Sequence, residues 1–92
     1  MPTSDATSKW AGFMPLSDLT MLTGRQTRAA RGLLNWQRRQ LADTAGLKIR
    51  TLTDFEIGAR APRKATKLTI AHALQAAGVE LLDGEGVALR AA

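Results

Sequence analysis

Apolar residues recur at helical spacing in four successive stretches of the chain, and each stretch ends at a glycine or a polar break. The expected helices span residues 24–34, 38–45, 49–57 and 65–77. Thr23 precedes the first of them and Gln26 follows three residues later, which is the spacing of a capping box. The pattern predicts a mainly α-helical domain.

The spacing also predicts which side of each helix faces the core. The inward residues expected on the first helix are Ala29, Ala30, Leu33 and Leu34, with arginines along its other side. Those expected on the later helices are Leu41, Ala42, Ala45, Leu52, Phe55, Leu68, Ala71 and Leu74.

The two ends of the chain have a different character. Residues 1–18 are rich in Ser, Thr, Asp and Pro and are expected to form a flexible arm. After Gly78, two β-prone runs flank the turn-like residues 83–86, which predicts a short C-terminal β-hairpin or strand. The apolar face of that tail would consist of Val79, Leu81, Val87 and Leu89.

Composition limits the class of protein. A chain of 92 residues suits one domain, and the absence of cysteine excludes disulfides and thiolate metal sites. The first residues lack the basic and apolar regions of a signal peptide, and no apolar run reaches the roughly 18 residues of a membrane span. We therefore expect a cytoplasmic protein without a membrane partner. His72 is the only histidine, so neither a metal nor a cofactor is expected.

The positive charge is concentrated in the helical region. Residues 25–67 contain eleven Lys or Arg against three acids, whereas the rest of the chain carries a net charge of −3. Such a segment is typical of a surface that binds phosphates, although a solvated basic face has the same composition.

Residues 38–57 have the pattern of a helix-turn-helix. Ala42 is small enough for two helices to approach closely, and Gly46 permits the sharp turn between them. Leu41, Leu47, Leu52 and Phe55 would fix the angle between the helices. In this motif the second helix enters the major groove of DNA.

At this point the chain resembles the Cro/C1-type helix-turn-helix family, the Xre-like transcriptional regulators. The resemblance covers residues 22–82, and the closing segment is similar to a bacterial subgroup. It lies in Arg28-Ala29-Ala30-Arg31, Leu33-Leu34-Asn35-Trp36, Leu41-Ala42-Asp43-Thr44-Ala45-Gly46-Leu47, Thr51-Leu52, Phe55-Glu56-Ile57-Gly58, Arg60-Ala61-Pro62-Arg63 and Ala76-Ala77-Gly78-Val79-Glu80-Leu81-Leu82.

The resemblance implies a lambda-repressor-like bundle of four to five helices, a homodimer and a palindromic operator. It implies base contacts from Lys48, Ile49, Arg50 and Asp54. It implies a phosphate contact from Arg38, and Arg39 and Thr51 are expected to make further ones. Arg60, Arg63 and Lys64 could form an ordinary polar loop, but their place just after the recognition helix favours phosphate contacts. Arg31 and Glu56 match a family pair that braces the first helix against the third.

Three residues depart from the family pattern. Arg38 stands where glutamine is usual, and Lys48 stands where a Ser or Thr would cap the third helix. Ile49 is exposed, and a thymine methyl group would give it an apolar partner. Asp54 has two possible roles: it could accept a hydrogen bond from cytosine, or it could orient Arg50 one turn back.

These observations predict a sequence-specific DNA-binding regulator, with a repressor as the leading interpretation. The domain organisation would be an arm (1–18), the helix-turn-helix domain (19–78) and a dimerisation tail (79–92). Alternatively, that tail folds back onto the last helix, and helix faces or the arm form the dimer.

Two other functions remain open. One is a DNA-binding antitoxin whose residues 1–18 would fold onto a small protein partner. The other is a protein-interaction module that sequesters an activator. An enzyme is not expected, because the sequence shows no nucleophile–base pair, no phosphate-binding glycine loop and no metal constellation.

Overall fold

The computed structural model describes residues 14–90, in which helices of one to four turns precede a C-terminal hairpin. The elements are the 3₁₀ helix η1 (Leu19–Met21), the α-helices α2 (Gly24–Leu34), α3 (Arg38–Ala45), α4 (Ile49–Glu56) and α5 (Lys64–Ala76), and the strands β1 (Val79–Leu82) and β2 (Gly86–Leu89). The mainly helical fold with a hairpin is confirmed. The bounds of α2 and α3 are as expected, α4 ends one residue earlier than expected, and α5 is displaced by one residue.

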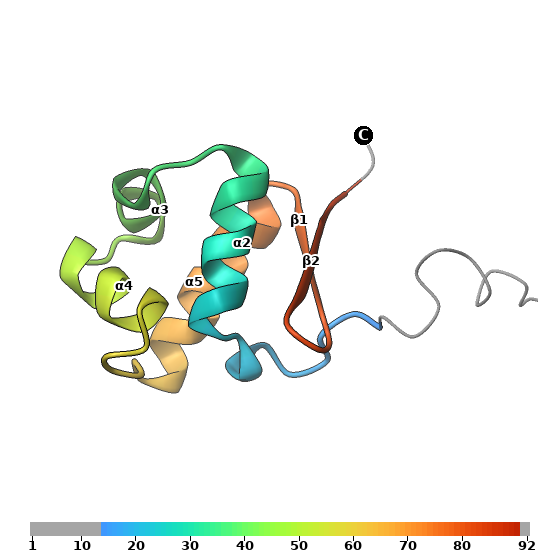
Figure 1. Ribbon diagram of the computed structural model, residues 1–92, viewed down its shortest axis with the longest axis horizontal. Helices are drawn as coiled ribbons and strands as arrows, with labels where there is room; N and C mark the ends of the chain where they lie inside the picture. The colour runs from blue at the N-terminus through green and yellow to red at the C-terminus, as the bar shows by residue number, and fades with distance from the viewer. Residues whose placement is uncertain (1–13, 91–92) are drawn as a thin grey trace, which may run out of the picture.

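Two central helices separate the helix-turn-helix from the hairpin. Figure 1 shows α3 and α4 on one side of α2 and α5, and the hairpin on the other. The core extends through all three parts, since Leu41 of α3, Leu52 of α4, Leu74 of α5 and Val79 of β1 are each fully buried. The hairpin is therefore an integral part of the domain core.

The inward face of α2 differs from the expected one. Ala30 is buried as predicted, but Ala29 is exposed and Leu33 is 40% exposed, so their inward assignment was wrong. Gln26 and Thr27 point inward instead, and both are buried. The inward face thus carries two polar side chains beside Ala30 and the partly buried Leu34, and both polar groups have hydrogen-bond partners there.

Gln26 is the side chain that joins α2 to the hairpin. Its Nε2 donates hydrogen bonds to the carbonyl oxygens of Leu82 and Gly86, each over 2.9 Å. Those carbonyls lie at the turn between β1 and β2, where the strand ladder ends. A buried amide that satisfies two backbone acceptors replaces the apolar contact that the sequence pattern predicted.

The apolar residues of the hairpin pack against helices of the same chain. The strands are antiparallel, with Val79 opposite Leu89 and Leu81 opposite Val87. Val79 and Leu81 are at most 2% exposed, because they pack into the domain core. Their assignment to a dimer interface is therefore corrected: only Leu89, which is 53% exposed, and the half-buried Val87 remain accessible.

The last residues of the expected arm belong to the folded domain. The N–H of Leu16 donates to the carbonyl of Leu81, and the N–H of Asp83 donates to the carbonyl of Met14, each over 2.8 Å. This segment runs antiparallel along β1, so the arm as expected over residues 1–18 is too long. Its residues 1–13 lie outside the described part. Asp18 caps η1, and hydrogen bonds from the Thr20 hydroxyl and N–H lower the pKa of its carboxyl.

Gly24 sets how closely α2 approaches the end of α4. A Cβ atom at this position would lie 2.0 Å from the carbonyl oxygen of Phe55 and 3.0 Å from the Cα of Glu56. Both neighbouring atoms belong to the backbone, so no side-chain movement could relieve the clash. Only glycine permits this packing, which also positions the residues on α4.

Gly24→Ala is expected to destabilise the domain by about 1–3 kcal/mol, since α2 must shift off α4. The melting temperature, measured by circular dichroism, should fall by roughly 4–8 °C for each kcal/mol of stability lost. Gly32→Ala is the matched control on the same helix, because a Cβ there meets nothing within 4 Å. It should raise stability by about 0.5–1 kcal/mol through helix propensity. Equal melting temperatures for the two variants would refute the close approach at Gly24.

Candidate nucleic-acid interface

The helix-turn-helix is built from α3, a turn at Gly46 and α4. Gly46 has a φ of +70°, the left-handed conformation that ends α3. The N–H of Leu47 then donates to the carbonyl of Ala42 over 2.8 Å, which closes the turn. Ala42 is 1% exposed, and Leu52 of α4 is fully buried. The turn thus leaves the first turn of α4 to project from the domain.

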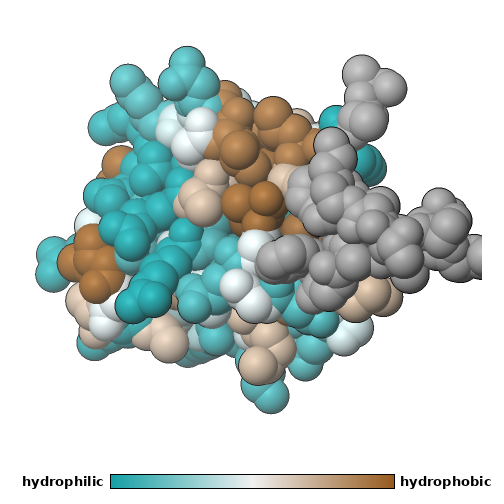
Figure 2. Space-filling view, turned by 45° about the vertical axis from the view of Figure 1, so that its right-hand side comes forward, coloured by the Kyte–Doolittle hydropathy of each residue, from teal (hydrophilic) through white to brown (hydrophobic). Residues whose placement is uncertain are grey.

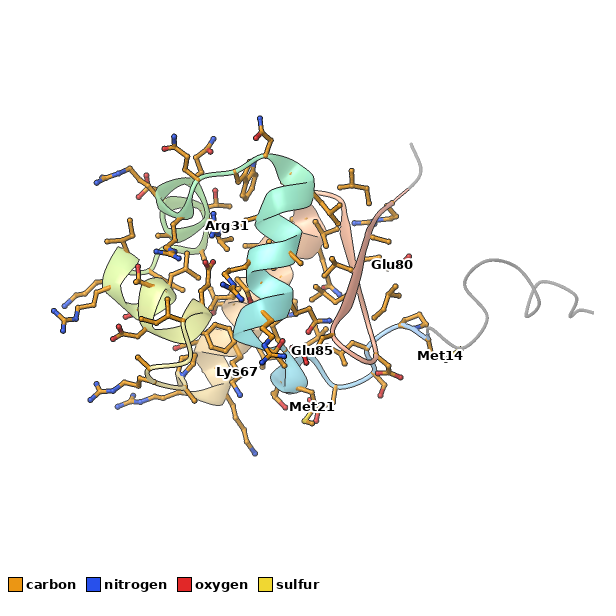
Figure 3. The ribbon with its side chains drawn as sticks, in the orientation of Figure 1. Met14, Met21, Arg31, Lys67, Glu80 and Glu85 are labelled. Carbon is orange, nitrogen blue, oxygen red and sulfur yellow. The ribbon has the colours of Figure 1, made fainter. Side chains whose placement is uncertain are left out.

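Glu56 at the end of α4 is held by a buried ion pair to α2. Its side chain is fully buried and accepts hydrogen bonds from Nε and Nη2 of Arg31, both over 2.7 Å. Arg31 also donates from Nη1 to the carbonyl of Trp36 over 3.0 Å. Figure 3 shows Arg31 directed into the space between α2, α3 and α4. The expected pair therefore joins α2, the α2–α3 corner and α4.

Arg38 is a third member of this cluster. Its Nε donates to Glu56 Oε1 over 3.0 Å, and its side chain is 33% exposed. From the sequence, only a phosphate contact was expected of Arg38, and this bond to a buried carboxylate was missed. A cation at this position does not by itself indicate a carboxylate partner 18 residues away in the chain. The bond engages Nε, and a third of the side chain is still exposed.

The first turn of α4 is exposed and lacks an internal cap. Lys48 occupies the N-cap position and makes no capping hydrogen bond through its side chain. Ile49 is 43% exposed, and the side chain of Arg50 is 89% exposed. Arg50 Nε lies 4.0 Å from Asp54 Oδ2 one turn later. This separation is compatible with the orienting role that Asp54 could have toward Arg50.

Further basic residues surround this turn. A hollow of about 190 Å³ lies between α4 and the following loop, lined by Lys48, Arg50, Thr51, Asp54, Arg60 and Pro62. Arg60, Arg63 and Lys64 are exposed, as is Arg39 on α3. The structure therefore brings three of the four expected base-reading residues, Lys48, Arg50 and Asp54, to one hollow together with Arg60. Ile49 does not line this hollow, and Arg38 is engaged with Glu56.

Comparison with known families agrees with this geometry. A helix-turn-helix family model, the Cro/C1-type or Xre-like class, matches residues 28–81. The chain belongs to this family. The match includes α3, the turn at Gly46, α4 and α5, so the motif recognised in the sequence is confirmed. Among curated proteins, none matches the chain.

Family membership defines the general activity of this helix-turn-helix protein. The family consists of DNA-binding regulators, so the exposed turn of α4 is part of a DNA-binding domain. Within residues 14–90, every helix is too short or too polar to span a bilayer.

Proposed function

We propose that this helix-turn-helix protein is a dimeric repressor that acts in the cytoplasm by occupying a palindromic operator. The exposed first turn of α4 carries the proposal. Arg50 projects from it with a side chain that is 89% exposed, and Lys48 leaves the helix terminus uncapped. An uncapped, basic helix start has a natural partner in the phosphates and base edges of a major groove. Such a protein acts by occupancy, and we assign it no catalytic step.

Each residue group has a separate role in the proposed complex. Arg50 would donate to a guanine and Ile49 would contact a thymine methyl group, with Asp54 holding Arg50 in place. Lys48 would contact a base or the adjacent phosphate. The phosphate contacts would come from Arg38, Arg39, Thr51, Arg60, Arg63 and Lys64.

A dimer is expected because one helix-turn-helix contacts too few base pairs. A single recognition helix contacts only a few base pairs, which is too few to select a site among genomic sequences. Two copies related by a dyad would double the site, with half-sites about 34–36 Å apart. The operator is therefore expected to be an inverted repeat with one helical turn between its half-site centres.

Selection of bound sequences from a random double-stranded DNA pool tests this function. The expected result is an inverted repeat that blocks transcription from a reporter promoter when placed across it. A protein that enriches no sequence, yet remains folded by circular dichroism, would contradict sequence-specific binding. Activation of the reporter would contradict repression.

Arg38→Ala is expected to weaken binding to all DNA sequences alike, because Arg38 would contact a phosphate and no base. The salt slope of log K should fall by about one unit. Fluorescence anisotropy at several salt concentrations measures both quantities. Arg28→Ala, which removes an exposed arginine from α2, is the charge-matched control and should leave the slope nearly unchanged. A changed base preference with an unaltered slope would contradict the phosphate contact.

A further inference from the structure

The outer edge of β2 offers backbone groups without a partner among residues 14–90. β1 lies between β2 and the segment Met14–Leu16, so both of its edges are paired. Within the described residues, β2 pairs with β1 alone. The N–H of Arg90 donates to the carbonyl of Gly78 over 2.7 Å, which continues the ladder by one pair. Because antiparallel bonding alternates, Ala88 points its N–H and C=O toward β1, and Val87 and Leu89 point theirs outward.

This edge lacks two of the usual means of protection. Gly86, Val87, Ala88 and Leu89 include no charged residue and no proline, which are the common means of blocking an exposed edge strand. Leu89 is 53% exposed. The edge is therefore suited to accept another strand.

An apolar patch continues from this edge onto α2. Ala29 and Leu33, one turn apart, are exposed on α2, which packs against β2. Figure 1 shows the C-terminal ends of α2 and β2 at the same end of the molecule. Figure 2 shows apolar surface gathered where α2 meets the hairpin. Backbone groups and apolar side chains are thus available together.

We propose that β2 pairs antiparallel with β2 of a second copy of this chain, about a two-fold axis through Ala88. This inference rests on the proposed dimeric regulator and names the surface that joins its subunits. The two hairpins would form one continuous four-stranded sheet. Leu33 and Leu89 of both copies would meet beside the axis and be covered.

The strand is self-complementary in this register. Val87 lies opposite Leu89 of the second copy, so outward-pointing backbone groups meet outward-pointing groups and bond in both directions. Arg90, whose Nη2 also donates to the carbonyl of Gln75, comes opposite Gly86 of the second copy, next to the turn that carries Asp83 and Glu85. Opposite charges thus meet at both ends of the paired strands, and this favours a second copy over an unrelated strand.

The two-fold symmetry of this dimer would also let both copies bind one DNA duplex. The two-fold axis of an antiparallel strand pair in a continuous sheet runs perpendicular to that sheet. α2 and α5 cover one face of the hairpin, and α3 and α4 lie beyond them (Figure 1). The axis therefore points through the helical layer, and both copies of α4 face the same side. One DNA duplex could contact both.

Ala88→Cys tests the register without DNA. The protein has no cysteine, so a single thiol is introduced. Ala88 would face its symmetry mate as a non-hydrogen-bonded pair, with Cα atoms about 4.5 Å apart, which a disulfide can span. Treatment with oxidised glutathione should give a covalent dimer that dithiothreitol reverses.

Glu80→Cys is the matched control. Glu80 lies opposite Ala88 on β1, and Figure 3 shows it on the side of the hairpin turned away from the helices. The two β1 strands would be separated by three strand spacings, about 14 Å, too far for a disulfide. Absence of cross-linking at position 88, or equal cross-linking at both positions, would overturn the proposed pairing.

A second pair of variants tests the apolar patch. Leu33→Glu combined with Leu89→Glu should sediment as a monomer at concentrations where the unaltered protein is a dimer, with an unchanged helical spectrum. Met21→Glu combined with Ile57→Glu is the control, since these residues are 64% and 61% exposed on other elements. The control should remain dimeric. Monomers in both cases, or dimers in both, would overturn the assignment.

The outcomes separate this inference from the proposed function. If the unaltered protein selects an inverted repeat but the Ala88→Cys variant does not cross-link, the proposed interface is overturned and the proposed function is kept. A cross-linked dimer that selects no DNA sequence keeps the interface and overturns the function.

Discussion

Glu56→Gln is expected to destabilise the domain by about 3–5 kcal/mol, the cost of removing one partner of a buried ion pair. The substitution preserves shape and leaves Arg31, 17% exposed, and Arg38, 33% exposed, facing a neutral amide. Small domains are stable by only about 5–15 kcal/mol, so a large share of the folded population should be lost near 37 °C. Urea unfolding followed by circular dichroism measures the change.

Asp54→Asn is the matched control on the same helix. Asp54 also faces an arginine, but Arg50 lies 4.0 Å away with a side chain that is 89% exposed. Exposed pairs of this kind contribute about 0–1 kcal/mol. The two substitutions remove the same charge from positions two residues apart, so they differ mainly in burial. Similar losses of stability would show that the Glu56 cluster is no stronger than a surface pair.

Local patterns predicted the helices well, because the signals that start and stop a helix lie within a few residues. Thr23 and Gln26 form the expected capping box, with the N–H of Gln26 donating to Thr23 Oγ1 over 3.0 Å. Gly46 ends α3 in the left-handed conformation. These contacts span three or four residues, and each can be recognised from the identity of one or two side chains.

The orientation of α2 could not be predicted in the same way. Gln26 is buried because it meets backbone carbonyls 56 and 60 residues away, and no local spacing reports such a partner. An apolar periodicity assigned Leu33 to the core, but Leu33 lies two turns beyond Gln26, near the end of α2, and is exposed. The error has a structural consequence, because the exposed Leu33 is part of the surface that we propose joins two copies.

The C-terminal tail shows a related limit of prediction from sequence. The alternation of Val79, Leu81, Val87 and Leu89 identified an apolar face, and that face is present. Alternation does not specify what covers the face, and here α2 and α5 of the same chain cover most of it. Removing everything after Gly78 would therefore unfold the domain core, so point variants on the edge of β2 are the sharper test.

Arg50→Ala is expected to relax the sequence preference at one base position in each half-site. A bidentate contact from arginine to guanine contributes about 1–3 kcal/mol of discrimination, which is roughly a 5- to 150-fold difference in affinity. Arg50 is the residue of α4 best placed for this role. It lies in the first turn, 89% of its side chain is exposed, and its structural partner is the exposed pair with Asp54. The folded domain should be unaffected.

Arg63→Ala separates base recognition from nonspecific electrostatic attraction to DNA. Arg63 is exposed at the N-cap of α5 and would contact only phosphate. Its removal takes away the same charge as Arg50→Ala, so both variants should lose a similar amount of nonspecific affinity. Sequences selected from a random pool should change at one position per half-site for Arg50→Ala and should stay the same for Arg63→Ala. If Arg50→Ala instead selects the unaltered consensus with uniformly lower affinity, Arg50 is a phosphate contact, and base discrimination must lie with Lys48, Ile49 or Asp54.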